Sequence, residues 1–288
     1  MRSILFPIFI TAAVSGLAHA ELGEQTAAAL QANYANTTQA CNGAPAFVCS
    51  GILLRTTRPS PAYHTWHHSP NSREKGGVAF SYLRADAPVE ALAEGASSGF
   101  ILLPRRQAPQ GSSAYRVLCA YPTDGDSWTR NARGCGDNSQ TEGVEQFCHE
   151  LGIDSAESWV ARYESTPGPE HQRYFAQCAF DVSRSRSAQA APAFYQSLRA
   201  MSLMPERPFA WNEVIVGAWD EATSANLPIQ AFFHVSGRDG LNNARFDQRD
   251  WHATTGKWLP VIEISLPDGE RPASFSYRNE DQAVAPSL

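Results

Sequence analysis

Three residues on separate predicted strands carry side chains that could act on a charged substrate. Arg55 follows three aliphatic residues in CSGILLRTT, and Ser81 alternates with the bulky Phe80 and Tyr82 in GGVAFSYLR. Later, WNEVIV sets Glu213 among apolar neighbours, where an acid is uncommon unless it is paired or catalytic. A guanidinium binds phosphate or carboxylate through paired hydrogen bonds, and a carboxylate stabilises developing positive charge. The same residues also suit a structural ion pair between strands, with a small residue where the sheet is crowded.

The stretch YHTWHHSP, residues 63–70, gathers three histidines and two aromatic rings between the Arg55 and Ser81 segments. Zinc needs three or four ligands on a firm scaffold, and neither H-E-x-x-H nor a cysteine pair at finger spacing is present. Surrounding prolines indicate a loop, so an exposed loop tip and a ligand-contacting loop are the main alternatives to a metal site. For the ligand-contacting loop, the candidate substrate-binding residues are Tyr63, His64, Trp66 and, on the next predicted strand, Tyr82.

Residues 95–99, GASSG, match the G-x-S-x-G pattern of a hydrolase nucleophile elbow. That elbow needs a strand before the serine and a helix after it. Here a weakly helical segment precedes the serine and the strand-like FILL follows, so an ordinary Ser/Gly turn is favoured over a serine hydrolase.

The elements that must position these residues are mainly strands. Period-two patterns predict strands at residues 51–57, 76–85, 99–103, 114–121, 174–182, 211–219, 228–235 and 259–266. Helical spacing predicts helices at residues 21–39, 89–94, 155–164, 192–201 and 242–255. Because strands and helices do not alternate regularly, the predicted fold class is α+β with a mixed or antiparallel sheet. Residues 279–288 show no stabilising pattern and are predicted to form a loose tail.

The start of the chain has the pattern of a secretory signal peptide. Arg2, an apolar run at residues 4–17 and the small-x-small sequence Ala18-His19-Ala20 predict a leader at residues 1–20. Nothing later approaches the ~20 apolar residues of a membrane helix. We therefore expect a secreted or periplasmic protein with a single domain at residues 21–288 and no membrane association after cleavage. A net charge of −6 argues against a nucleic-acid partner.

An even number of cysteines in an exported chain predicts disulfides rather than metal ligands. All of them lie after the leader, at Cys41, Cys49, Cys119, Cys135, Cys148 and Cys178. The one pairing that the residues favour is Cys41 with Cys49, because the Gly and Pro between them let a short loop close. Residues 122–143 are rich in Gly, Asp, Asn and Ser, which indicates a disulfide-pinned insertion in the sheet.

The succession of an arginine strand, a serine strand and a glutamate strand resembles the Arg-Ser-Glu class of ADP-ribosyltransferases and NAD glycohydrolases. More narrowly, several stretches look like the halovibrin family of exported bacterial proteins and together reach from Asn33 to Leu266. They are NYANTTQACNGAPAFVCSGILLRTT, YHTWHHSP, GGVAFSYLRAD, AFYQSLRAM, WNEVIV and DQRDWHATTGKWLPVIEISL.

The resemblance implies an ADP-ribosyltransferase fold whose cleft binds NAD as substrate, without a separate cofactor. Arg55 would hold pyrophosphate or ribose, Ser81 would brace Glu213 or a ribose hydroxyl, and Glu213 would face the ribose cation, in the manner of glycoside hydrolysis. The aromatic loop would then be a mobile flap that stacks on nicotinamide or adenine.

Two departures from the class pattern weaken the match, and the second of them, the missing upstream acid, favours hydrolysis of NAD over transfer to a host or target-cell protein, as in a toxin. The serine strand reads Phe80-Ser81-Tyr82 instead of Ser-Thr-Ser, and Trp211 stands where a second acid would assist the acceptor. The alternative function is a non-catalytic secreted module that recognises a glycan or a cell-surface partner.

Overall fold

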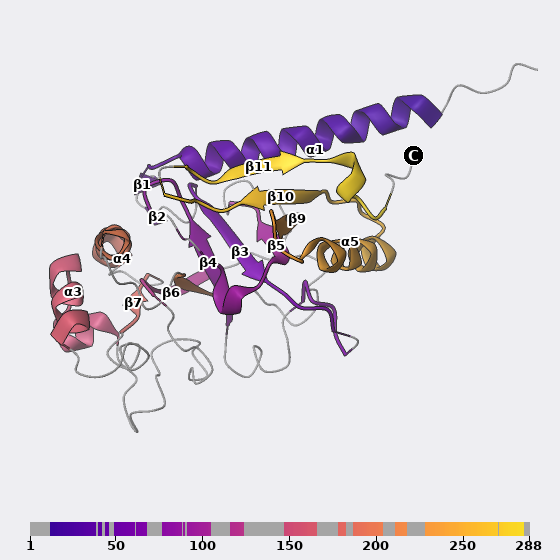
Figure 1. The fold of residues 1–288 in the computed structure, drawn as a ribbon. Helices are drawn as coiled ribbons and strands as arrows, with labels where there is room; N and C mark the ends of the chain where they lie inside the picture. The colour runs from indigo at the N-terminus through magenta and orange to yellow at the C-terminus, as the bar shows by residue number, and fades with distance from the viewer. Residues whose placement is uncertain are drawn as a thin grey trace, which may run out of the picture.

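The computed structural model shows one mixed sheet with helices on both faces (Figure 1). It describes residues 12–38, 40–41, 44–45, 49–60, 62–67, 77–87, 89, 91–104, 116–123, 147–165, 178–182, 187–203, 211–217, 228–269 and 271–284. The helices in these ranges are α1 (Ala12–Ala35), α3 (Ala156–Ser165), α4 (Ser187–Ser202) and α5 (Leu241–Thr255). Short 3₁₀ turns are η2 (Ala93–Gly95), η5 (Cys148–Leu151) and η8 (Asn279–Asp281).

The described strands of the large sheet run in the order β11-β10-β9-β5-β3-β4-β8-β6-β7. Their bounds are β3 (Ile52–Thr56), β4 (Val78–Leu83), β5 (Ser98–Leu102), β6 (Arg116–Tyr121), β7 (Phe180–Asp181), β8 (Glu213–Gly217), β9 (Ile229–Val235), β10 (Val261–Ser265) and β11 (Ser274–Tyr277). A separate small pair joins β1 (Ala40–Cys41) to β2 (Ala44–Pro45). Neighbouring strands of the large sheet are antiparallel except β9 and β10, whose parallel pairing is bridged by α5. The predicted α+β class with a mixed sheet is confirmed.

Alternation along the strands gives the sheet two apolar faces. One face carries Phe80, Phe100 and Phe232, and α4 and α5 cover it. The other face carries Leu54 and Ile101, among others, and is covered by α1. Figure 1 shows α1 lying along β11, with α5 at one end of the sheet and α3 and α4 at the other.

Helix α5 matters most for the site because polar side chains interrupt its buried stripe. Ala244, Asp247, Gln248 and Trp251 are all buried at spacings of three and four residues, so they share one face. The helix ends at Gly256, which adopts the left-handed conformation with φ of 69° and donates its N–H to a carbonyl of the last turn.

Most predicted elements are present, and three expectations need correction. Residues 89–94 were expected to be helical, but the described part forms only η2, a single 3₁₀ turn. Strand β11 has no counterpart among the predicted strands. The tail prediction is wrong for residues 279–284, where Asp281 is buried and Gln282 accepts a hydrogen bond from Gln248 and exchanges hydrogen bonds with the backbone of Val261. Residues 285–288 lie outside the described ranges.

Helix α1 continues through the predicted cleavage point after Ala20. In the part of α1 whose side chains are described, from Ala20 onward, Gly23 lies against the ring of Tyr277, and Leu30 and Tyr34 are buried. No helix among the described residues is both long and apolar enough to cross a membrane.

Candidate functional site

The three predicted catalytic residues lie on adjacent strands at the centre of the sheet. β3, which carries Arg55, pairs with β4, and β4 pairs with β8. Leu54 is opposite Ser81, and Phe80 is opposite Val214. Continued by one pair, the second register sets Ser81 beside Glu213.

The side-chain amide of Asn212 extends this pairing of β4 with the start of β8. It accepts a hydrogen bond from the backbone N–H of Tyr82 and donates one to the carbonyl of Tyr82, each at 2.8 Å. Where the two strands separate, the Asn212 side chain thus replaces the backbone hydrogen bonds that an opposing residue would make. This local exchange fixes the position of Glu213, the next residue, against β4.

The register nevertheless places Arg55 on the opposite face from the other two. Arg55 is opposite Phe100, whose ring lies 5.8 Å from that of Phe80, so Arg55 shares the face that α4 and α5 cover. Ser81 and Glu213 alternate with Phe80 and Val214 and face the other way. The guanidinium of Arg55 donates to the carbonyl of Ala79 at 3.3 Å.

Gly99 lets β5 lie close to the backbone of β3 at Arg55. A Cβ atom at this position would lie 1.8 Å from the carbonyl oxygen of Arg55. Only glycine allows that approach, so the spacing of the two strands, and with it the position of the guanidinium, depends on residue 99.

The aromatic loop is docked onto α5. Trp66 is 1% exposed; its ring stacks on that of His64 and meets that of Trp251 edge-on, with a centroid distance of 4.8 Å in each pair. Its indole N–H donates to Oδ2 of Asp250 at 2.8 Å. A ligand could stack on Trp66 only if this packing opened.

His64 is the most accessible polar group of this loop. Its Nδ1 lies 2.7 Å from Oδ2 of Asp250, and its side chain is 43% exposed. A carboxylate partner fixes the proton on Nδ1, which leaves Nε2 as the basic nitrogen. Among the described contacts none involves Nε2. An imidazole with one nitrogen held by an acid and the other available is the arrangement of a general base.

The two tyrosines of the predicted binding set differ in access. Tyr63 is 41% exposed beside His64. Tyr82 is fully buried, and its hydroxyl donates to the carbonyl of Ser50 at 3.1 Å. Burial also raises the pKa of the Tyr82 phenol above its ordinary value. Of the two tyrosines, only Tyr63 is placed to contact a ligand in this conformation.

Asp247 and Asp250 are the site residues that sequence reasoning missed. Both lie on α5, where Asp247 is 1% exposed and accepts hydrogen bonds from the hydroxyls of Thr57 and Thr65. One signal was available: Asp247 falls on the same helical stripe as Trp251, and an acid on an apolar stripe needs partners.

A second missed group, centred on Arg84, is structural. The guanidinium is fully buried, binds both carboxylate oxygens of Asp86 at 2.5 and 2.8 Å, and lies 4.4 Å from the centre of the Tyr195 ring. Its hydrogen bond to the carbonyl of Thr38 ties the end of α1 to the sheet.

Residues 95–99, GASSG, do not have the strand-turn-helix geometry of a hydrolase nucleophile elbow. The 3₁₀ turn η2 ends at the first of them, Gly95, and β5 begins at Ser98. The Ser97 hydroxyl donates to the carbonyl of Asp239 at 3.0 Å, and that of Ser98 points to the carbonyl of Thr57. The preference for an ordinary Ser/Gly turn is confirmed.

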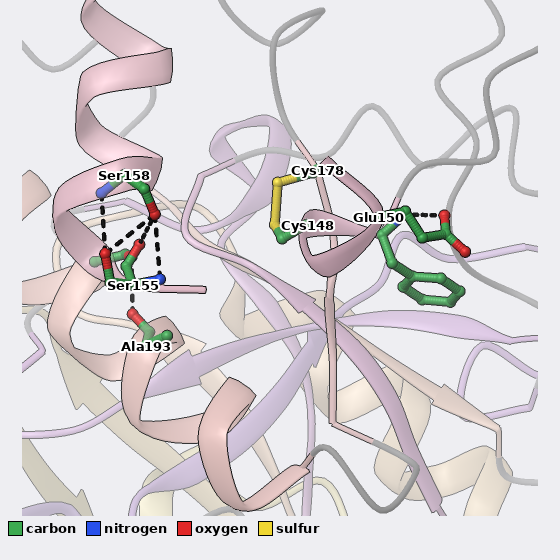
Figure 2. Close-up of a disulfide and its surroundings, with 8 residues drawn as sticks. Cys148, Glu150, Ser155, Ser158, Cys178 and Ala193 are labelled. Atoms are coloured by element: carbon green, nitrogen blue, oxygen red, sulfur yellow. Dashed lines mark hydrogen bonds between the residues drawn. A yellow bond between two sulfur atoms is a disulfide. The ribbon is translucent and has the colours of Figure 1, made fainter. Parts of the chain in front are cut away.

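Disulfides were predicted in general, and one of them is fully described. It lies far from the aromatic loop. Cys148 and Cys178 are bonded beside the first turn of α3, where Ser155 and Ser158 cap the helix through their hydroxyls (Figure 2). Cys49 and Cys119 are also disulfide-bonded. Cys135 and the side chain of Cys41 lie outside the described part, so the predicted Cys41–Cys49 pairing stays a prediction, as does the insertion at residues 122–143, most of which is undescribed.

Comparison with known proteins does not assign a family. No protein-family model matches the chain, and a search of curated proteins finds no match. The halovibrin resemblance therefore remains a prediction from the residues quoted for it.

Proposed function

We propose that the chain is an exported hydrolase of NAD in which His64, oriented by Asp250, is the general base. The observation that carries this proposal is the 2.7 Å contact between Nδ1 of His64 and the Asp250 carboxylate on a half-exposed ring. Packing against Trp66 and the second hydrogen bond to the same oxygen of Asp250 hold the imidazole in one orientation. Such preorganisation is what a catalytic base requires.

The proposed reaction breaks the bond between the ribose C1′ and the nicotinamide nitrogen. The electron pair of that bond goes to the nitrogen and cancels its positive charge, while the oxygen of a water molecule bonds to C1′. The water gives one proton to Nε2 of His64, which releases it to solvent. The products are ADP-ribose, nicotinamide and one proton.

Arg55 is the residue proposed to hold the pyrophosphate. It lies two positions before Thr57 on the same pleat, so the two side chains point to the same face about 7 Å apart along the strand. Thr57 in turn is hydrogen-bonded to Asp247 of α5 at 2.9 Å. Arg55 and the His64 loop therefore share one face of the sheet, and a guanidinium is suited to paired phosphate oxygens.

This proposal gives Ser81 and Glu213 no part in the reaction. Both are buried on the other face, with exposed fractions of 4% and 7%. The ADP-ribosyltransferase fold and the direction of the reaction, hydrolysis rather than transfer to a protein, remain parts of the proposal that the resemblance alone supports.

The test is release of nicotinamide from NAD by the purified oxidised protein, compared among single variants. His64→Gln should lower the rate by about 10²–10⁴-fold, the range for loss of a general base. Glu213→Gln should leave the rate close to wild type, and so should His149→Gln, a matched change at the distant disulfide. Arg55→Lys should raise KM more than it lowers kcat.

Two results would overturn the proposal. Loss of activity in Glu213→Gln with activity kept in His64→Gln would return the chemistry to the glutamate strand. A wild-type protein that leaves NAD intact would exclude NAD hydrolysis, and binding of glycans to the exposed Tyr63 ring would be the next property to measure. Melting temperatures of all variants separate these outcomes from unfolding.

A further inference from the structure

One buried carboxylate joins three segments of the site. Oδ2 of Asp247, on α5, accepts a hydrogen bond of 2.9 Å from the hydroxyl of Thr57, which follows β3. Oδ1 accepts one from the hydroxyl of Thr65 in the loop at residues 62–67. Both donors are neutral, and no cation lies within ion-pair distance of Asp247 among the described residues. The loop is thus attached to the helix through a charge that lacks a counterion.

The charged groups nearby do not compensate this carboxylate. Asp250, one turn further along α5, adds repulsion, and it is itself bonded to His64. Arg55 shares the face of Thr57 but directs its guanidinium to the carbonyl of Ala79. The strands beneath α5 contribute the apolar Phe100 and Phe232 and, two residues after Phe232 on the same face, His234, whose Nε2 is already engaged with Asp281 Oδ2 at 3.1 Å.

We infer that the protonation state of Asp247 controls how firmly the loop at residues 62–67 is docked. The loop is held to α5 more firmly when the Asp247 carboxyl is protonated than when it is ionised. Asp247 is therefore a positioning residue for the loop that bears His64. This protonation-dependent docking is a property of the fold and does not depend on NAD being the substrate.

The direction follows from the cost of burying a charge. Desolvation is the largest effect on Asp247 and raises its pKa from 3.8 to about 6, although the two hydroxyl bonds act in the opposite direction. Opening the loop returns the carboxylate to water, where its pKa falls back towards the ordinary value. The closed state consequently binds the proton more tightly and gains population as pH falls through about 6.

The size of the effect follows from the two pKa values. With about 6 for the closed state and 3.8 for the open state, the closed-to-open ratio should rise about tenfold between pH 7.5 and pH 5. Above pH 7 the carboxylate is ionised in both states, so the ratio should level off there.

Hydrogen exchange of the loop measures this ratio directly. The indole N–H of Trp66 and the amide of His67, which donates to the carbonyl of His64, report opening after correction for the intrinsic exchange rate. In the wild type, opening at pH 5 should be about tenfold rarer than at pH 7.5. Asp247→Asn, a neutral isostere, should remove the pH dependence, while the exposed Asp268→Asn should retain it.

The His64–Asp250 pair is the competing source of a pH effect, because a protonated imidazole would also bind the loop to α5. His64→Gln removes that source and should leave the tenfold change in place. The inference is overturned by pH-independent opening in the wild type, or by a pH dependence that survives Asp247→Asn and disappears in His64→Gln. Because no substrate is used, a negative result here is distinct from failure of the proposed hydrolysis.

Discussion

Trp66 is the residue that converts the aromatic loop from a surface feature into part of the core. Its ring is buried between those of His64 and Trp251, and its N–H bonds to Asp250. Trp66→Ala should therefore destabilise the protein by about 3–5 kcal/mol, the usual cost of deleting a buried large aromatic ring. Trp66→Phe keeps most of the packing and loses the hydrogen bond, so its cost should be smaller, about 1–2 kcal/mol.

Urea denaturation of both variants measures these differences. The exposed neighbour Tyr63, changed to alanine, is the control and should alter the free energy of unfolding little. A Trp66→Ala protein as stable as the wild type would show that the loop is not docked in solution.

The sequence shows which residue types a site could contain, but it does not show which face of the sheet each side chain occupies. Arg55, Ser81 and Glu213 were correctly assigned to strands that turn out to be adjacent. Which face each side chain occupies depends on register, and a shift of one residue reverses it. That register depends on long-range contacts, such as the pairing of the Asn212 amide with Tyr82, which local patterns do not contain.

Elements with strong local periodicity were predictable, and elements stabilised by distant partners were not. Helix α5 carries its own stripe and its terminal Gly256, so its bounds follow from sequence. The segment at residues 278–284 has no such pattern. Its order comes from Gln248, which is fully buried, donates to Gln282 at 2.9 Å and accepts from the amide of Ala283 at 2.7 Å.

This segment predicts a measurable role for Gln248. Gln248→Leu would leave the amide of Ala283 and the carbonyl of Leu259 without their described partner, which should cost about 1–3 kcal/mol for two part-buried polar groups. The change should also speed hydrogen exchange at residues 281–284. Gln25→Leu, an exposed glutamine on α1, is the matched control and should do neither. Unchanged exchange in Gln248→Leu would mean that the segment is held by other contacts.

Helix α1 joins the segment predicted to be removed in export to residues that pack on the sheet. Among the side chains of α1 that the structure describes, from Ala20 onward, Ala27, Leu30 and Tyr34 are buried and cover the face opposite α5. Tyr34 also accepts a hydrogen bond from the backbone N–H of Ala273 at 3.1 Å, which fixes the helix to the chain just before β11. Removal of residues 1–20 in export would therefore leave this packing in place.

Two truncations separate these parts. A chain of residues 21–288 should melt within a few degrees of the full chain, because its described apolar contacts are intact. A chain of residues 36–288 loses the burial of Leu30 and Tyr34, each of which contributes about 1.5–3 kcal/mol, together with smaller contacts such as that of Ala27. Since a typical domain is stable by only about 5–15 kcal/mol, this second chain should melt far lower or fail to fold. If instead residues 21–288 unfold, the first twenty residues belong to the folded body, and the signal-peptide prediction would have to be given up.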